Sequence, residues 1–239
     1  MFGTHGTTFI WATALMVLGV NSGAGETWSE AKTLRLGPDG NACGLVAPAS
    51  AKPAGVILWL HGGMRSGTDN KGWTAWQAPL PFLRPGSKYV CSPSAFAGAD
   101  WLTEAGQAHI EALLDYLDDS TAARLDDLIL IGVSDGCLGA LRYAKFGKRH
   151  PTRFVLISSY PALAVDTATL IRDRAYTFTR WEVFQGGRDR LFPATAVFPL
   201  LRVWAGANPK VRLHLYPEGE HDYSWYARQA GGELRKAFR

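Results

Sequence analysis

The sequence of 239 residues has no Cys and His spacing typical of a metal site, and no glycine loop of the type that binds phosphate. It therefore predicts no cofactor and no metal. Internal repeats and low-complexity segments are also absent. With 47% hydrophobic and 19% charged residues, the composition is that of a globular protein and excludes a disordered or fibrous class.

The chain has no stripe of basic residues, although its formal net charge is +4. The densest basic group lies near the end of a predicted helix, where cations interact favourably with the helix dipole. This group consists of Arg142, Lys145, Lys148 and Arg149. The sequence therefore predicts no nucleic-acid partner.

No apolar run reaches the roughly 20 residues that a membrane-spanning helix needs, so we expect no stable insertion into a membrane. The run from Phe9 to Val20 has the length of a signal-peptide core and is followed by small residues. Lys and Arg are absent before it, which leaves a mis-assigned start or a short membrane anchor as alternatives. We predict a signal peptide over residues 1–25, a secreted or periplasmic protein, and a single domain over residues 26–239.

What the chain does contain is a regular alternation of short apolar runs and helical patterns. The strands Thr33–Leu36 and Ala42–Ala47 flank a turn rich in Gly, Pro and Asn, which predicts an antiparallel hairpin. Further strands are predicted at 55–60, 89–91, 125–133, 154–157, 181–184 and 211–216, and helices at 105–117, 138–146, 162–172, 195–204 and 224–238. This order predicts an α/β fold with a mostly parallel sheet of eight strands and helices on both faces. In such sheets, functional groups gather beyond the carboxyl ends of the strands.

The segment from Gly132 to Gly136, with the sequence Gly-Val-Ser-Asp-Gly, ends a strand that reads as buried. A serine between glycines, at a sharp turn from a strand into a helix, projects its hydroxyl over the edge of the sheet. Only small neighbours allow the backbone to fold so tightly. Ser134 is therefore the candidate nucleophile.

A serine nucleophile needs an imidazole to take its proton, and the imidazole needs a carboxylate to orient it. His221 has the required place, because it lies in the loop after the last predicted strand. The other histidines lie in the leader, before the first helix, inside or after helices, or inside a strand: His5, His61, His109, His150 and His214. The alternative is that His221 is a surface histidine without a role.

The candidate acid is Asp189, which follows the strand ending at Phe184 in a loop where glycines bend the chain over the sheet edge. Four other aspartates fit less well, two because they precede their strand and one because it would point away from the base: Asp126, Asp127, Asp222 and Asp166. We therefore predict that Asp189 orients His221.

The negative oxygen of a tetrahedral intermediate needs two hydrogen-bond donors, and backbone N–H groups are suitable because they cannot swing away. One candidate is the N–H of Asp135, at the start of the helix that follows Ser134. The second is the N–H of Gly63, with Met64 as the alternative. These groups are the predicted oxyanion hole.

Taken in order, the segment His61 to Gly63, the Gly132 to Gly136 elbow, Asp189 and His221 resemble the α/β-hydrolase fold. The resemblance covers nearly the whole chain after the leader. It implies an esterase-type serine hydrolase in which these residues form the catalytic triad and the oxyanion hole.

The connection between the predicted strands ending at Ile157 and starting at Trp181 is short, with no room for a large lid. In this respect the chain is similar to the lidless carboxylesterase, acyl thioesterase and dienelactone-hydrolase branches, whose pocket tends to be open. Ser134 departs from the cysteine nucleophile of the dienelactone hydrolases, and Met64 departs from the lipases with three successive glycines.

Cys43 opens one predicted strand and Cys91 closes another. In an eight-stranded sheet whose second strand is antiparallel and lies beside the fourth, these two ends are neighbours. We therefore predict a disulfide between them, with Cys137 as a small buried residue beneath the elbow. Three free cysteines are the alternative.

Aromatic residues in the loops at the carboxyl edge predict a rim that suits an apolar or aromatic acyl group. We expect Phe96, Trp101 and Tyr223 to contact the substrate, although some aromatic rings of these loops would be core residues.

We interpret the chain as a serine esterase that cleaves small-molecule or polymeric carboxylic esters through an acyl-enzyme on Ser134. A serine peptidase of the same fold and a non-catalytic binding protein that kept the fold are the alternatives. The sequence does not indicate an oligomeric state.

Overall fold

The computed structural model describes residues 13–14, 28–36, 41–48, 53–63, 71–84, 87–95 and 100–239. These residues form one nine-stranded sheet in the order β1-β2-β3-β5-β4-β6-β7-β8-β9. The strands are β1 (Thr13–Ala14), β2 (Lys32–Leu36), β3 (Asn41–Val46), β4 (Ala54–Leu60), β5 (Lys88–Ser92), β6 (Ala123–Val133), β7 (Arg153–Ile157), β8 (Arg180–Gly186) and β9 (Val211–Tyr216). The two-residue β1 lies at the edge beside β2, and the other strands are the predicted sheet.

The hairpin β2–β3 is antiparallel, and β3 runs antiparallel to β5. From β5 onward, across β4, β6, β7, β8 and β9, all neighbouring strands are parallel. The predicted mostly parallel sheet with an N-terminal antiparallel hairpin is therefore confirmed. The carboxyl ends of the parallel strands meet at one edge, where the candidate site lies.

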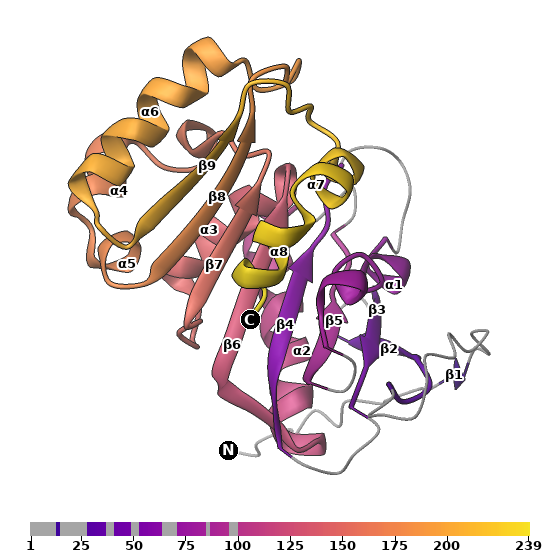
Figure 1. Ribbon diagram of the computed structural model, residues 1–239. Coiled ribbons are helices and arrows are strands. Elements are labelled where there is room, and N and C mark those ends of the chain that lie inside the picture. The colour runs from indigo at the N-terminus through magenta and orange to yellow at the C-terminus, as the bar shows by residue number, and fades with distance from the viewer. Residues whose placement is uncertain are drawn as a thin grey trace, which may run out of the picture.

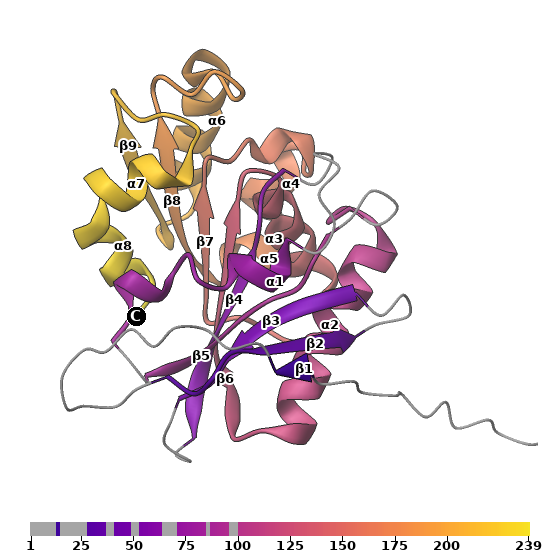
Figure 2. The ribbon, with the colours of Figure 1, turned by 90° about the vertical axis from the view of Figure 1, so that its right-hand side faces the viewer.

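Helices cover both faces of the sheet, as predicted (Figure 1). They are α1 (Gly72–Ala75), α2 (Glu104–Ser120), α3 (Asp135–Phe146), α4 (Thr167–Arg172), α5 (Arg174–Thr177), α6 (Ala194–Ala207), α7 (Tyr223–Gln229) and α8 (Gly231–Ala237), with the short 3₁₀ helices η1 (Leu80–Phe82) and η2 (Pro161–Leu163). Figure 2 shows α7 and α8 on one side of the sheet and α2, α3 and α4 on the other.

Each face has its own apolar core. Leu113 of α2, Leu141 of α3 and Trp204 of α6 belong to one core, and Tyr226 of α7 and Leu234 of α8 belong to the other. A parallel strand packed on both faces has no solvent side, so it is apolar along its whole length. This explains why β4, the most continuous apolar run among the predicted strands, lies at the centre of the sheet.

Two predicted helices are each divided in the structure. The predicted helix 162–172 becomes η2 and α4, because the Asp166 carboxylate accepts a hydrogen bond from Thr169 N–H. The separate helix α5 follows, since the Asp173 carboxylate accepts a hydrogen bond from Ala175 N–H. Each of these caps starts a new helix. The predicted helix 224–238 is divided into α7 and α8 at Ala230, beside the poor helix formers Gly231 and Gly232.

The predicted disulfide is wrong, because Cys43 and Cys91 are not bonded to each other. Their strands are antiparallel neighbours as expected, but the register places Cys91 opposite Leu45. Residues offset by two positions across an antiparallel pair lie about 7–8 Å apart, whereas a disulfide needs Cα atoms within roughly 6.8 Å. Cys137 is buried beneath the elbow, with its thiol near the carbonyl oxygens of Gly132 and Ile157.

The predicted signal peptide, residues 1–25, lies outside the described residues except for Thr13 and Ala14 of β1. Within the described ranges, no helix has the length and apolar character needed to cross a membrane.

Candidate active site

Ser134 lies between β6 and α3 in a strained backbone conformation, with φ 52° and ψ −117°. The flanking glycines are required by close backbone contacts. A Cβ atom on Gly132 would lie 2.4 Å from the Gly136 carbonyl oxygen, and one on Gly136 would lie 2.1 Å from the Leu60 carbonyl oxygen. Any side chain at either position would therefore force the turn open.

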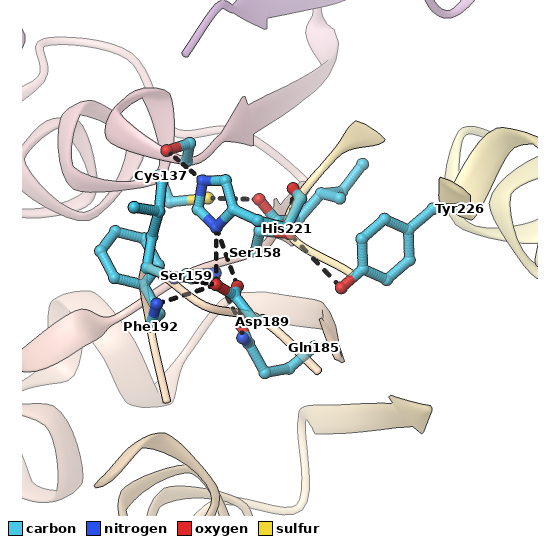
Figure 3. A network of polar contacts seen from close by, with 11 residues as sticks. Cys137, Ser158, Ser159, Gln185, Asp189, Phe192, His221 and Tyr226 are labelled. Atoms are coloured by element: carbon cyan, nitrogen blue, oxygen red, sulfur yellow. Dashed lines mark hydrogen bonds and ion pairs between the residues drawn. The ribbon is translucent and has the colours of Figure 1, made fainter. Parts of the chain in front are cut away.

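The structure brings the three residues selected from the sequence into one hydrogen-bonded chain. His221, in the loop between β9 and α7, has its Nε2 atom 2.8 Å from Ser134 Oγ. Its Nδ1 atom lies 2.9 Å and 2.8 Å from the two carboxylate oxygens of Asp189. Figure 3 shows the imidazole of His221 above the Asp189 carboxylate. The Asp189 side chain is completely buried, whereas that of His221 is 20% exposed.

Asp189 is held by neutral donors in addition to His221. Its Oδ1 atom accepts hydrogen bonds from the N–H groups of Leu191 at 2.9 Å and Phe192 at 2.8 Å. Its Oδ2 atom accepts one from the Gln185 amide at 3.0 Å. Burial alone would raise the pKa of Asp189, but the hydrogen bonds from His221, Phe192 and Gln185 outweigh it and hold the pKa below 3.8. The carboxylate therefore stays ionised beside the imidazole.

Gln185 was not among the residues selected from the sequence. It is completely buried in β8. Besides donating to Asp189, its amide oxygen accepts a hydrogen bond from the Ser159 N–H at 2.8 Å. The only sequence signal for Gln185 is its place at the end of an apolar strand and directly before two glycines, which does not reveal its partners.

Two of the four rival carboxylates serve as helix caps. Asp222 accepts a hydrogen bond from Ser224 N–H at 3.0 Å, and Asp166 accepts one from Thr169 N–H at 2.9 Å. Both are exposed. An aspartate that caps a helix points its oxygens at that helix, so Asp222 is directed away from His221 despite being its neighbour in sequence.

The predicted oxyanion donors adjoin Ser134 on two sides. Asp135 is the first residue of α3, where backbone N–H groups point outward along the helix axis. On the other side, a Cβ atom on Gly62 would lie 3.0 Å from Ser134 Cβ, and Gly63 has φ 67°, a conformation that favours glycine. The Lys71 ammonium donates to the Gly63 carbonyl oxygen at 2.6 Å and so ties this loop to the start of α1. Met64, the alternative donor, lies outside the described residues.

His61 supports the loop that carries Gly63. Burial is the main cause that lowers the pKa of His61 to about 4, so its ring is neutral near pH 7. Its Nε2 atom accepts a hydrogen bond from Ala95 N–H at 3.0 Å, and its Nδ1 atom lies 3.0 Å from the Gly62 carbonyl oxygen. One nitrogen thus accepts and the other donates, which is the pattern of a neutral imidazole.

The structure describes two of the three predicted aromatic contact residues, Trp101 and Tyr223, and it contradicts the prediction for Trp101. Trp101 does not line a pocket, because it is completely buried, with its indole N–H donating to the His61 carbonyl oxygen at 3.0 Å. Tyr223 joins α7 to the segment after α1, since its hydroxyl donates to the Ala78 carbonyl oxygen at 2.9 Å. Phe96 lies outside the described residues.

A different apolar surface lies beside His221. The ring of Phe192 meets the His221 ring edge-on at 5.0 Å between centroids, and the ring of Tyr160 lies 6.1 Å from that of Phe192. Two exposed leucines adjoin these rings in sequence, Leu163 with 52% and Leu191 with 67% of its surface exposed. Both leucines follow the carboxyl ends of strands, β7 and β8 respectively.

Within the described ranges, no group of three or more His, Cys, Asp and Glu side chains is arranged to hold a metal ion.

Neither a protein-family model nor a curated protein matches this sequence. Solved structures do match. A cold-adapted esterase from an Arctic intertidal metagenomic library is 17% identical, with a TM-score of 0.60 over 93% of this chain and 99% of that one. The S-formylglutathione hydrolase FrmB from Staphylococcus aureus is 13% identical, with a TM-score of 0.63 over 90% of this chain and 100% of that one. A thermostable esterase is 17% identical, with a TM-score of 0.61 over 87% of this chain, which spans 60% of the esterase's length.

Proposed function

We propose that this chain, which has the α/β-hydrolase fold, is a serine hydrolase that cleaves carboxylic esters. The observation that carries the proposal is the chain of contacts from Ser134 Oγ through the His221 ring to Asp189, with 2.8 Å at each end. Because the two ring nitrogens face opposite ways, the imidazole can take the serine proton while the carboxylate stabilises the charge it acquires. The esterases among similar structures support the same reaction class.

In the first half of the reaction, Ser134 Oγ attacks the ester carbonyl carbon while His221 Nε2 takes the hydroxyl proton. The carbonyl oxygen becomes negatively charged, and the backbone N–H groups of Gly63 and Asp135 stabilise it. The C–O bond to the alcohol then breaks, and the alcohol leaves with the proton that His221 held. Ser134 remains as an acyl ester.

In the second half, a water molecule gives a proton to His221 and attacks the acyl carbon. The intermediate collapses, Ser134 recovers its proton from His221, and the carboxylic acid is released. Asp189 stays ionised throughout and stabilises the imidazolium twice in each cycle. No other group is needed for the proton balance.

The apolar part of the ester would lie against the surface formed by Tyr160, Leu163, Leu191 and Phe192. Leu163 and Leu191 are more than half exposed. The ring of Tyr160 contacts that of Phe192, which contacts His221. Burying apolar groups of a substrate there contributes about 0.8 kcal/mol per methylene. We therefore expect esters with apolar chains to be preferred over acetates.

The test compares Ser134→Ala with Ser120→Ala, a control at the exposed end of α2. Hydrolysis of p-nitrophenyl butyrate should fall by roughly 10⁵-fold in Ser134→Ala and stay unchanged in the control. A fluorophosphonate probe should label the wild type at Ser134 only. Unchanged hydrolysis in Ser134→Ala would contradict the proposal. Cleavage of peptide anilides without ester cleavage would favour a peptidase, and a folded wild type that takes no label would favour a binding protein.

We also propose that residues 1–25 are removed on export, which leaves residues 26–239 as one domain in a secreted or periplasmic protein. The apolar run from Phe9 to Val20 supports this. Removal would take away β1 and leave β2 as the edge strand of the sheet. Mass spectrometry of the protein from an exporting host should find a new N-terminus near residues 23 to 26, whereas an intact Met1 would contradict the proposal.

A further inference from the structure

Two non-glycine residues in the described part of the chain have a positive φ, Ser134 at 52° and Ser158 at 56°. This conformation is unfavourable for a residue with a side chain, so it persists only where its surroundings enforce it. The turn at the nucleophile accounts for Ser134. Ser158, at the end of β7, needs a different explanation.

Ser158 is completely buried and contacts the main chain of the candidate base. Its hydroxyl donates to the backbone carbonyl oxygen of His221 at 2.8 Å. The hydroxyl of Tyr226, on α7, lies 3.3 Å from Ser158 Oγ. A serine has only one hydroxyl proton, so Tyr226 is the donor in this second contact. Figure 3 shows Ser158 between His221 and Tyr226.

The same strand end also fixes the nucleophile. The backbone N–H of Ser134 donates to the carbonyl oxygen of Ile157 at 2.9 Å, and Ile157 is the residue before Ser158. The N–H of Ser158 in turn donates to the Phe184 carbonyl oxygen in β8 at 2.9 Å. Ile157 therefore holds the nucleophile, and Ser158, the next residue, holds the base.

This arrangement bears on how the backbone of His221 is positioned. His221 lies in a loop, its side chain is partly exposed, and its ring must meet Ser134 and Asp189 at the same time. Asp189 acts on the ring of His221, whereas Ser158 acts on its backbone. A misplacement of about 1 Å in such a site can lower the rate roughly 100-fold.

We propose that Ser158, supported by Tyr226, is a positioning residue that fixes the backbone of His221 relative to Ser134. The left-handed conformation of Ser158 directs its hydroxyl at the loop that carries the base. This inference rests on the proposed function, because it assigns His221 as the base.

The principal variant is Ser158→Gly, which removes the hydroxyl but tolerates φ 56° and therefore keeps the fold. Its kcat should fall about 10- to 100-fold, with KM changed less than twofold. Relief of the strain at φ 56° should offset part of the stability lost with the two hydrogen bonds of the hydroxyl. Ser158→Ala should lose the same activity and more stability than Ser158→Gly, because it loses the same hydrogen bonds without relieving the strain at φ 56°. Tyr226→Phe should lose less activity than Ser158→Gly, and the double variant should lose no more than Ser158→Gly alone.

Tyr176→Phe is the matched control, because Tyr176 is also buried and its hydroxyl also donates to a backbone carbonyl oxygen, that of Leu141. It should lose stability without losing kcat. The second readout is the downfield proton resonance of His221 Nδ1–H, measured without substrate. It should shift or broaden in Ser158→Gly and stay unchanged in Tyr176→Phe.

Full kcat and an unchanged resonance in Ser158→Gly would overturn the positioning role. If Ser134→Ala is inactive at the same time, the proposed function stands and only this inference fails. A loss of kcat that only follows a fall in melting temperature, with an unchanged resonance, would also overturn it. Because the resonance needs no substrate, it tests the role of Ser158 even if the wild type hydrolyses no ester.

Discussion

Strands β8 and β9 lead to two pairs of a histidine and a carboxylate, and only His221 has its second ring nitrogen at a serine hydroxyl among the contacts of the described residues. In each pair, the two residues lie 32 positions apart in the sequence. His214 and Glu182 lie inside the strands, with 2.8 Å between Nε2 and Oε2. His221 and Asp189 lie in the loops after the same strands, with 2.8 Å between Nδ1 and Oδ2. Distance alone therefore does not distinguish a catalytic pair from a structural one.

The two pairs differ in ring orientation and in the charges around the acid. His214 uses Nε2 for its acid and stacks on Phe184 at 4.3 Å, whereas His221 uses Nδ1 and has Nε2 directed at a hydroxyl. Glu182 has Arg212 at 3.6 Å as a second partner. The other donors to Asp189 are neutral, so its charge is matched mainly by the charge that develops on His221. In the proposed mechanism, the charge of Asp189 is therefore available to stabilise the imidazolium of His221.

The largest effect is expected from replacing the two histidines. His221→Gln should lower kcat for p-nitrophenyl butyrate by roughly 10⁵-fold, because the variant lacks the imidazole that contacts Ser134 Oγ. His214→Gln should stay within about twofold of the wild type, since its ring only bridges two strands. Equal losses in the two variants would show that the pairs do not differ in function.

Replacing the two acids should affect kcat in the same order as replacing the two histidines, but the loss of kcat should be smaller. Asp189→Asn should lower kcat roughly 10⁴-fold, because an amide favours the wrong imidazole tautomer. Glu182→Gln should leave kcat unchanged and lower the free energy of unfolding by about 1–3 kcal/mol through its weakened contacts to His214 and Arg212. Kinetics and urea unfolding of both variants test this. A fall in kcat for Glu182→Gln beyond tenfold would contradict it.

The fold and the order of the site follow from signals that are local in the sequence. β4 is apolar along its length, and the elbow around Ser134 needs its two glycines for contacts that lie within one turn. The resemblance to the α/β-hydrolase fold, stated from these signals, is confirmed by the sheet order and by the similar solved structures. Asp189 and His221 were selected because both follow a strand at the same edge.

What the sequence does not predict depends on contacts between distant segments. The register of β3 against β5 separates Cys43 from Cys91, and no local pattern specifies that register. Trp101 is buried because its indole packs on His61, far away in sequence. Ser158 and Gln185 look like ordinary strand-end residues until their partners are known. The roles of polar residues at the ends of buried strands are therefore hard to predict from the sequence, and the structure reveals them by showing their partners.

His61 extends the comparison to a buried histidine whose hydrogen-bond partners are backbone groups. Its pKa is lowered from 6.5 to about 4, by burial above all. The unfolded chain therefore binds a proton at mildly acidic pH that the folded chain does not. The neutral ring of His61 therefore makes its full contribution to stability above pH 6.5. As the pH falls from 6.5 to about 4, the free energy of unfolding decreases by about 2–3 kcal/mol.

Urea unfolding at pH 7.5 and 4.5 measures this effect. His61→Gln should show a smaller difference between the two pH values than the wild type, because glutamine does not titrate. The charges nearest to His61, Lys71 and Asp135, are the same in both proteins. An equal loss of stability on acidification in both would contradict the assignment to His61.

The smallest effect concerns the surroundings of the two histidines. Arg212 lies near His214, whereas the segments after β7 and β8 expose Leu163 and Leu191. If an apolar ester chain rests on these leucines, Leu191→Ser should reduce the gain in kcat/KM from p-nitrophenyl acetate to octanoate by about three- to tenfold, which corresponds to about 0.7–1.4 kcal/mol of lost apolar contact. Val203→Ser is the control, because Val203 is similarly exposed but lies on α6. An equal change in both variants would mean that the chain lies elsewhere, since general effects of a polar substitution would then explain it.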